Sequence, residues 1–79
     1  MAIPNWREHT IKLAAEVVGP VAEIIVDDTI EKYGFADTEM VPTTYLRFLE
    51  SLYKELPMDV DRKTLCLHIR DTVIKNFGH

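Results

Sequence analysis

The chain has 79 residues and a mass of 9.1 kDa, enough for a single small domain over residues 1–79. Apolar residues make up 47% and charged residues 28%, a balance typical of a globular chain and not of a disordered one. The net charge of −4 argues against nucleic acid as the main partner, because no positive field draws the chain to phosphates. A chain this short has a small core and marginal stability, which leaves room for stabilisation by a second copy or a partner.

The sequence predicts a cytoplasmic protein without a membrane anchor. The stretch from Met1 to Glu8 has neither the basic start nor the apolar segment of a signal peptide. No purely apolar run is longer than Ile24-Ile25-Val26, far short of the roughly 20 residues that a membrane span needs. The single cysteine, Cys66, excludes an internal disulfide and fits a reducing compartment.

The first predicted helix spans residues 5–18. Asn5 and Glu8 have the spacing of a capping box, in which each side chain bonds a free backbone N–H of the first turn. Gly19 follows the helix and offers the left-handed conformation that commonly ends one.

The second predicted helix spans residues 20–33, with Pro20 as a favourable first residue and Gly34 after its end. Its first two turns are apolar on nearly every side, which indicates contacts on more than one side and a central position in the domain. Because only Gly19 and Pro20 separate the first two helices, they either fold back sharply or continue as one kinked helix.

The third predicted helix spans residues 42–56. Pro42 suits its first turn, and Pro57 ends it because proline disfavours a helical conformation at the residue before it. Phe48 and Tyr53 flank its apolar face. That face consists of Tyr45, Leu49, Leu52 and Leu56.

The fourth predicted helix spans residues 61–77, with Asp59 or Asp61 as its cap and Gly78 after its end. Leu65, Leu67 and Ile74 lie beside its main apolar stripe. That stripe consists of Cys66, Ile69, Val73 and Phe77. No stretch alternates as a strand would, so the expected fold is all-α: a compact bundle of four helices with short loops, and residues 20–33 at its centre.

The sequence predicts no metal, cofactor or catalytic site. Cys66 and His68 are two residues apart on a helix and point about 200° apart, so they cannot hold one ion. Glu23, Asp27 and Glu31 recur every four residues, but the Glu-x-x-His partner motif of metal-binding bundles is absent. This acidic face is expected to lie in solvent or against the basic residues of the fourth helix, Arg62, Lys63, Arg70 and Lys75. Without a glycine-rich loop or an activated serine, the chain is not expected to be an enzyme.

Aromatic residues are the remaining candidates for function. Tryptophan and tyrosine are favoured anchors of protein interfaces, and the chain has more aromatic rings than four short helices readily bury. The candidate interface residues are Trp6, Phe35, Phe48, Tyr53 and Phe77. Trp6 and Tyr53 are the foremost, because Trp6 lies near a chain end and Tyr53 lies off the main stripe of its helix. The alternative is that these rings fill the core of the chain.

One segment resembles a known family. It runs from Leu13 to Val26 and places Gly19-Pro20 between two apolar helices, and the later patterns Tyr45-Leu46-x-x-Leu49 and Leu52-x-x-Glu55-Leu56 extend the likeness. It resembles a small helical domain at the C-termini of some bacterial serine/threonine kinases and response regulators. The resemblance implies a helical signalling accessory domain that makes protein contacts and has no catalytic residues to carry over.

The expected function is a small non-catalytic module for protein–protein interaction or dimerisation in bacterial signalling or regulation. Its expected partner is a second copy, in a homodimer, or another protein. The alternative is a small DNA-binding transcriptional regulator that uses the third and fourth helices as a helix-turn-helix. Residues 1–40 carry three basic and eight acidic residues, and residues 41–79 carry six basic and five acidic ones. The two halves could therefore attract each other, within one chain or between two.

Overall fold

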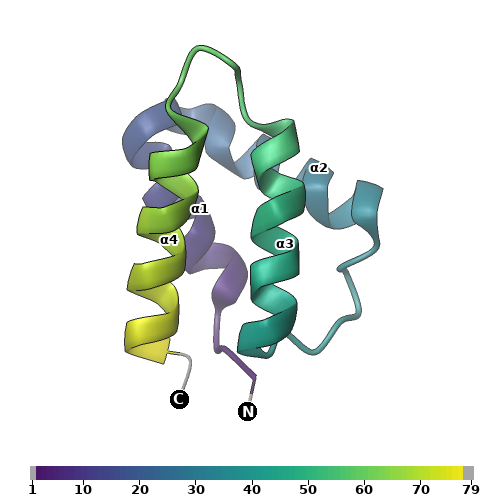
Figure 1. Cartoon of the computed structure of the whole chain (residues 1–79). Coiled ribbons are helices and arrows are strands. Elements are labelled where there is room, and N and C mark those ends of the chain that lie inside the picture. Colours follow the sequence, from purple (N-terminus) through teal and green to yellow (C-terminus); the bar gives the residue numbers. More distant parts are fainter. Residues whose placement is uncertain (1, 78–79) are drawn as a thin grey trace.

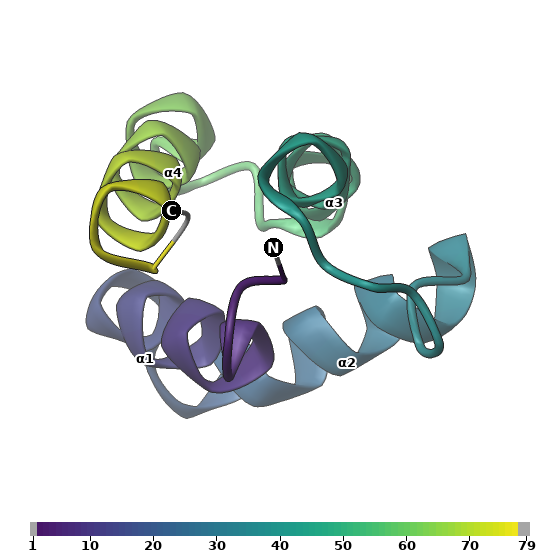
Figure 2. The same ribbon diagram turned by 90° about the horizontal axis from the view of Figure 1, so that it is seen from below.

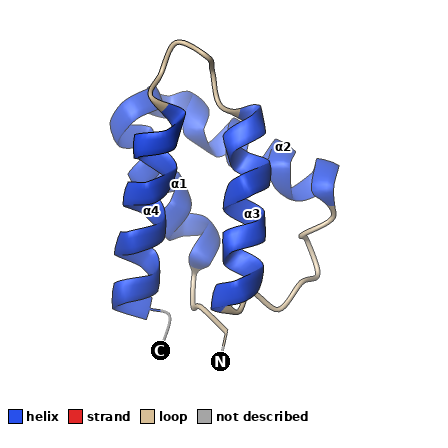
Figure 3. Cartoon of the chain, viewed as in Figure 1, coloured by secondary structure: helices blue, strands red, loops and turns tan. Residues whose placement is uncertain are grey.

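The computed structural model describes residues 2–77, in which all regular structure is helical (Figures 1 and 3). The predicted all-α class is confirmed. The elements are α1 (Trp6–Val18), the 3₁₀ turn η1 (Gly19–Val21), α2 (Ala22–Tyr33), α3 (Pro42–Glu55) and α4 (Arg62–Phe77). Because no loop separates α1, η1 and α2, the chain forms three helical runs, and the first two predicted helices are the two parts of one broken run. Gly78 and His79, and with them the predicted glycine after the last helix, lie outside the described residues.

Gly19 produces the break between α1 and α2. Its φ of 73° is positive as predicted, but its ψ of −151° differs from the left-handed helical value and belongs to a region that only glycine adopts readily. Its N–H still bonds the carbonyl of Ala15, so α1 ends with its hydrogen bonds intact. Pro20 then lies in the 3₁₀ turn, and α2 begins at Ala22 and not at Pro20 as predicted.

The helices form two layers, with α1 and α2 in one and the antiparallel pair α3 and α4 in the other (Figure 2). Within the described residues α2 packs on α1 and α3 but does not touch α4. The predicted central position of this helix is therefore wrong. The apolar first turns of α2 are not buried on every side, because Ile24 is 63% exposed to solvent.

The core is centred on α3, which buries Tyr45, Leu49 and Leu52 of the predicted apolar face and also Phe48 beside that face. On α4 the buried stripe is Leu65, Ile69 and Val73. The predicted stripe on α4 is thus rotated slightly, and Cys66 and Phe77 lie half-buried at its edge. The remaining buried apolar residues come from the N-terminal stretch, α1, α2 and the segments beside α3: Ile3, Ala14, Ala22, Val26, Met40 and Leu56.

Helix ends follow the predictions in part. Asp61 is the cap of α4, where its carboxylate accepts the N–H of Thr64 at 3.1 Å and the hydroxyl of Thr64 at 2.8 Å. Gly34 adopts the left-handed conformation after α2. The predicted capping box does not form, because Asn5 itself is left-handed (φ 51°, ψ 36°) and its side chain makes no cap hydrogen bond.

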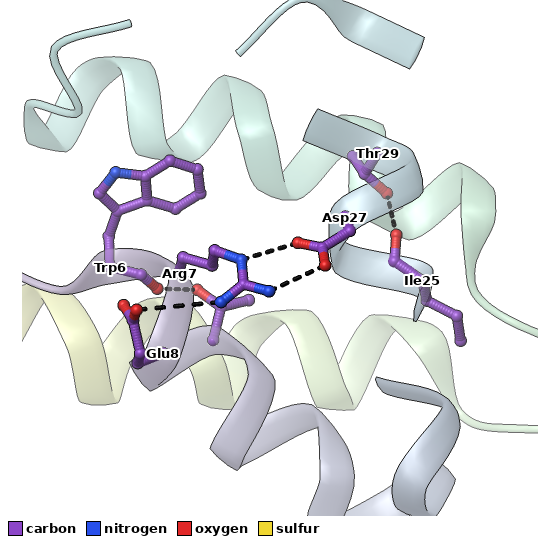
Figure 4. A network of polar contacts seen from close by, with 7 residues as sticks. Trp6, Arg7, Glu8, Ile25, Asp27 and Thr29 are labelled. Atoms are coloured by element: carbon purple, nitrogen blue, oxygen red, sulfur yellow. Dashed lines mark hydrogen bonds and ion pairs between the residues drawn. The ribbon is translucent and has the colours of Figure 1, made fainter. Parts of the chain in front are cut away.

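Two polar contacts hold the broken helical run in place, and Figure 4 shows the first of them. The guanidinium of Arg7 on α1 donates to both carboxylate oxygens of Asp27 on α2, at 2.7 and 2.8 Å. Inside the core the hydroxyl of Thr10 bonds the carbonyl of Trp6 and lies 2.7 Å from the hydroxyl of Tyr45. These bonds tie α1 to α2 and to α3, so the angle of the break is fixed from both sides.

The Arg7–Asp27 pair predicts a pH-dependent contribution to stability. The hydrogen bonds from Arg7 lower the pKa of Asp27 below its ordinary 3.8, against an opposing effect of burial. A depressed pKa stabilises the fold above the unfolded value and loses that effect as the pH falls through the folded value. Because both side chains are partly exposed, Asp27→Asn is expected to cost up to about 1 kcal/mol at neutral pH.

Urea unfolding of the Asp27→Asn protein and of the wild type, from neutral pH down to the acid limit, measures this difference. The gap in unfolding free energy should close below pH 3.8. Asp28→Asn is the matched control, because Asp28 is exposed and forms no ion pair among the described residues. A gap that stays constant across this pH range would contradict the assignment.

Candidate functional site

An open groove runs between α3 and α4, on the side where both helices expose side chains to solvent. It has a volume of about 640 Å³. Its lining, which we call the α3–α4 groove, consists of Leu46, Leu49, Glu50, Tyr53 and Lys54 from α3 and Lys63, Cys66, Leu67 and Arg70 from α4. Leu46, Glu50 and Tyr53 follow each other by one helical turn, so they form a second stripe on α3 beside the buried one.

Apolar side chains provide most of the groove's contact surface. Leu46, Tyr53 and Leu67 are between 38% and 41% exposed, although leucine is normally buried in so small a domain. Leu49 and Cys66 lie deeper, where the thiol of Cys66 points at the carbonyl of Leu49 at 3.9 Å. An exposed apolar strip across two neighbouring helices is typical of a surface that binds another helix.

The rim of the groove is basic, although the whole chain is acidic. Among the lining residues Lys54, Lys63 and Arg70 are basic and Glu50 is the one acidic residue, although Arg70 also pairs with Asp71 at 2.9 Å. Arg62 adds a further cation at the mouth, with its guanidinium 4.6 Å from the ring centre of Tyr53. The electrostatic field of the groove therefore favours a partner with acidic groups around an apolar centre.

The thiol of Cys66 is expected to be unreactive in this position. Burial raises the pKa of its thiol to about 11, and the nearby Arg62 offsets only part of this effect. Because the thiolate is the reactive form, little of it is present at neutral pH. Cys66 thus serves the groove as a small apolar side chain.

This protonation state predicts slow alkylation. Iodoacetamide should modify Cys66 in the folded chain roughly a hundredfold more slowly than in the urea-unfolded chain at neutral pH, since about two pKa units separate the thiols. Mass spectrometry over time measures both rates, with free cysteine as the control for the effect of urea. Equal rates in the folded and unfolded chains would contradict the buried, protonated thiol.

Of the five candidate interface aromatics, only Tyr53 lies in the groove. Phe48 is fully buried, with the rings of Trp6 and Phe35 edge-on to it at 5.1 and 5.3 Å, so the prediction that it forms an interface is wrong. Phe77 is half-buried and stacks on His9 at 3.9 Å. Trp6 and Phe35 are half-buried against the core. The alternative that aromatic rings fill the core thus holds for most of them.

Sequence reasoning did not assign Leu46 and Leu67 to a binding surface. By its spacing Leu67 lies beside the predicted stripe of α4, and Leu46 belongs only to the patterns that resemble a known family. A signal was present, because Leu46 and Tyr53 are seven residues apart on α3, and Leu67 likewise lies off its buried stripe.

The charged residues of α2 do not meet those of α4 as one alternative expected. Asp27 pairs with Arg7 of α1, and Lys32 pairs with Glu55 of α3 at 3.2 Å. Among the described residues, the ion-pair contact between an acidic side chain of α1 or α2 and α4 is that of Glu16 on α1, whose carboxylate is 3.9 Å from Nε2 of His68. Within residues 2–77 no three histidine, cysteine, aspartate or glutamate side chains are placed to hold a metal ion.

Two further geometric features bear on partners. The helices α3 and α4 lie side by side and antiparallel (Figures 1 and 2), whereas a helix-turn-helix crosses its two helices at a wide angle. The helix-turn-helix interpretation therefore does not fit this pair. Among the described residues, no helix has the length and apolar character needed to cross a membrane.

Comparison with known proteins gives one match. Residues 6–76 match a family model described as "Domain of unknown function (DUF8082)", and the chain belongs to this family. No curated protein and no solved structure matches the chain significantly. The match spans all the helices and the groove, and it makes no connection with the accessory domains of kinases and response regulators.

Proposed function

We propose that this member of the DUF8082 family is a non-catalytic protein-interaction module whose α3–α4 groove binds an apolar helical surface with acidic flanks. One observation carries the proposal: Leu46, Tyr53 and Leu67 form an exposed apolar strip with a basic rim on a chain of net charge −4. A role in signalling or regulation, and a cytoplasmic setting, belong to the same proposal. Such a module acts by bringing proteins together.

In binding of this kind, apolar contacts and charges contribute in different ways. Covering the exposed part of each of the three apolar side chains contributes roughly 0.5–1 kcal/mol, a fraction of the value for full burial. The basic rim mainly raises the association rate and the selectivity and adds little affinity, because exposed charges are screened by salt. The expected complex is therefore modest in affinity and selective for acidic over basic partners.

A pair of designed peptides tests the proposal. Both are amphipathic helices of roughly four turns with the same apolar stripe, one with glutamate and the other with lysine on the flanks. Titration of fluorescein-labelled peptide, followed by anisotropy, should show the glutamate peptide binding roughly tenfold more tightly at low salt. Equal affinities, or no binding of the glutamate peptide at millimolar chain concentration, would overturn the proposal.

Matched variants locate the binding site. Leu67→Glu places a carboxylate in the groove and should weaken binding of the glutamate peptide at least roughly tenfold. Met58→Glu is the control, because Met58 is 85% exposed and lies in the loop between α3 and α4, outside the groove lining. Circular dichroism must show both variants folded. Unchanged binding by a folded Leu67→Glu chain would remove the groove as the site.

A further inference from the structure

The corner between α1 and α2 carries a second exposed apolar surface. Val17 at the end of α1, Val21 in η1 and Ile24 in the first turn of α2 are all exposed, and Ile24 more so than Leu46, Tyr53 or Leu67 of the groove. We call these three residues the corner surface. They stand within eight residues of chain around Gly19, whose unusual backbone angles produce the corner. Nothing in the core requires large apolar residues at these three positions.

The surroundings of the corner surface are acidic. Between Leu13 and Glu31 the sequence has five acidic residues and no lysine or arginine. One of the five, Asp27, is bound by Arg7. Among the described residues Glu23, Asp28 and Glu31 form no ion pair, and Glu16 has only the distant contact with His68. The corner thus presents an apolar centre with acidic flanks, the chemistry that the groove favours.

The corner surface and the α3–α4 groove cannot meet within one chain. The corner belongs to the layer of α1 and α2 (Figure 2), whereas the groove is lined entirely by residues of α3 and α4. Within the described residues α2 does not touch α4. The acidic half does contact the basic half inside the chain, through α1 on α4 and α2 on α3, but no corner residue lines the groove, so two copies are needed to bring these surfaces together.

From these observations, and resting on the proposed function of the groove, we propose that its occupant is the corner surface of a second copy of this chain. Ile24, Val17 and Val21 then cover Leu46, Tyr53 and Leu67, while Glu23 and its acidic neighbours face Lys54, Lys63 and Arg70. The two surfaces differ, so the contact is heterologous: each copy uses its groove on one neighbour and its corner on another. Association then continues into a ring or an open chain and does not stop at a symmetric dimer.

Two variants, each with one surface disabled, separate this arrangement from a symmetric dimer. Ile24→Lys disables the corner and keeps the groove, and Leu67→Glu does the reverse. Light scattering after size exclusion, from micromolar to millimolar concentration, measures the mass. With increasing concentration the mass of the wild type should rise beyond twice the chain mass of 9.1 kDa, and the mass of each variant alone should remain at 9.1 kDa. An equimolar mixture should approach twice that mass, because one intact groove and one intact corner remain.

Several results would overturn the inference. A wild-type chain that stays at 9.1 kDa at millimolar concentration would do so, as would an Ile24→Lys chain that associates like wild type, or a mixture that remains monomeric. Met58→Lys is the control and should associate as wild type does. If wild type is monomeric but the glutamate peptide still binds the groove, the proposed function stands with a different protein as partner. If the peptide also fails to bind, both proposals fall.

Discussion

Replacing Phe48 by alanine is expected to lower the free energy of unfolding by about 3–5 kcal/mol. Phe48 is fully buried, and the rings of Trp6, Phe35 and Tyr45 lie against it at centroid distances of 5.1, 5.3 and 6.0 Å. These rings come from α1, α3 and the loop after α2, so truncation leaves a cavity that no single side chain can fill. Urea or thermal unfolding followed by circular dichroism measures the loss.

The size of this loss decides whether the chain folds at all. A domain of this length has a total stability of about 4–12 kcal/mol, so the loss removes all of the stability at the lower end of this range and less than half of it at the upper end. Met58→Ala serves as control and should change stability by no more than about 0.5 kcal/mol, because Met58 is exposed. A Phe48→Ala chain that loses less than about 1 kcal/mol would contradict the central position of this ring.

Replacing Gly19 by alanine is expected to cost about 1–3 kcal/mol. A Cβ at Gly19 would meet no heavy atom within 4 Å, so the cost comes from the backbone and not from a clash. The angles of φ 73° and ψ −151° are strained for every residue that has a Cβ. The same variant is expected to weaken self-association, since relaxation of the corner moves Val17 relative to Ile24.

Gly34 provides the matched comparison. It also has a positive φ and open space around its Cβ position, but its angles are those of the ordinary left-handed region. Gly34→Ala should cost about 1–2 kcal/mol, and Gly34→Asn less, because asparagine tolerates this conformation. Thermal unfolding of the three variants should therefore rank Gly19→Ala lowest. A Gly19→Ala chain as stable as wild type would show that the corner has a different backbone geometry.

The sequence is informative about α3 because several local signals agree there. Pro42 marks the start, Pro57 lies two residues after the last helical residue, Glu55, and the apolar spacing from Tyr45 to Leu52 specifies one buried face. The position of α2 could not be obtained in this way. The apolar residues in its first turns predict burial, but the bend at Gly19 leaves Ile24 exposed to solvent. That bend depends on contacts with distant parts of the chain.

The candidate site was predictable only in part, for a related reason. Tyr53 lies off the main stripe of α3 and lines the groove, but Phe48 also flanks that stripe and is buried. The difference arises because α3 packs on both α2 and α4, so its buried face is wider than one stripe on the side where Phe48 lies. Spacing along one helix does not reveal how many neighbours the helix has. The groove could therefore be identified only from the structure, in which α3 lies beside α4.

Chemical-shift mapping shows directly whether the α3–α4 groove is a binding surface. Uniformly ¹⁵N-labelled chain is titrated with the glutamate-flanked helical peptide, and the backbone amide shifts are followed residue by residue. The titration uses the Ile24→Lys chain, which is expected to be monomeric. We expect the largest shifts on Leu46, Tyr53 and Leu67 and their neighbours in the groove, and none at the corner around position 24. Shifts concentrated elsewhere, or none at saturating peptide, would contradict the proposed binding site.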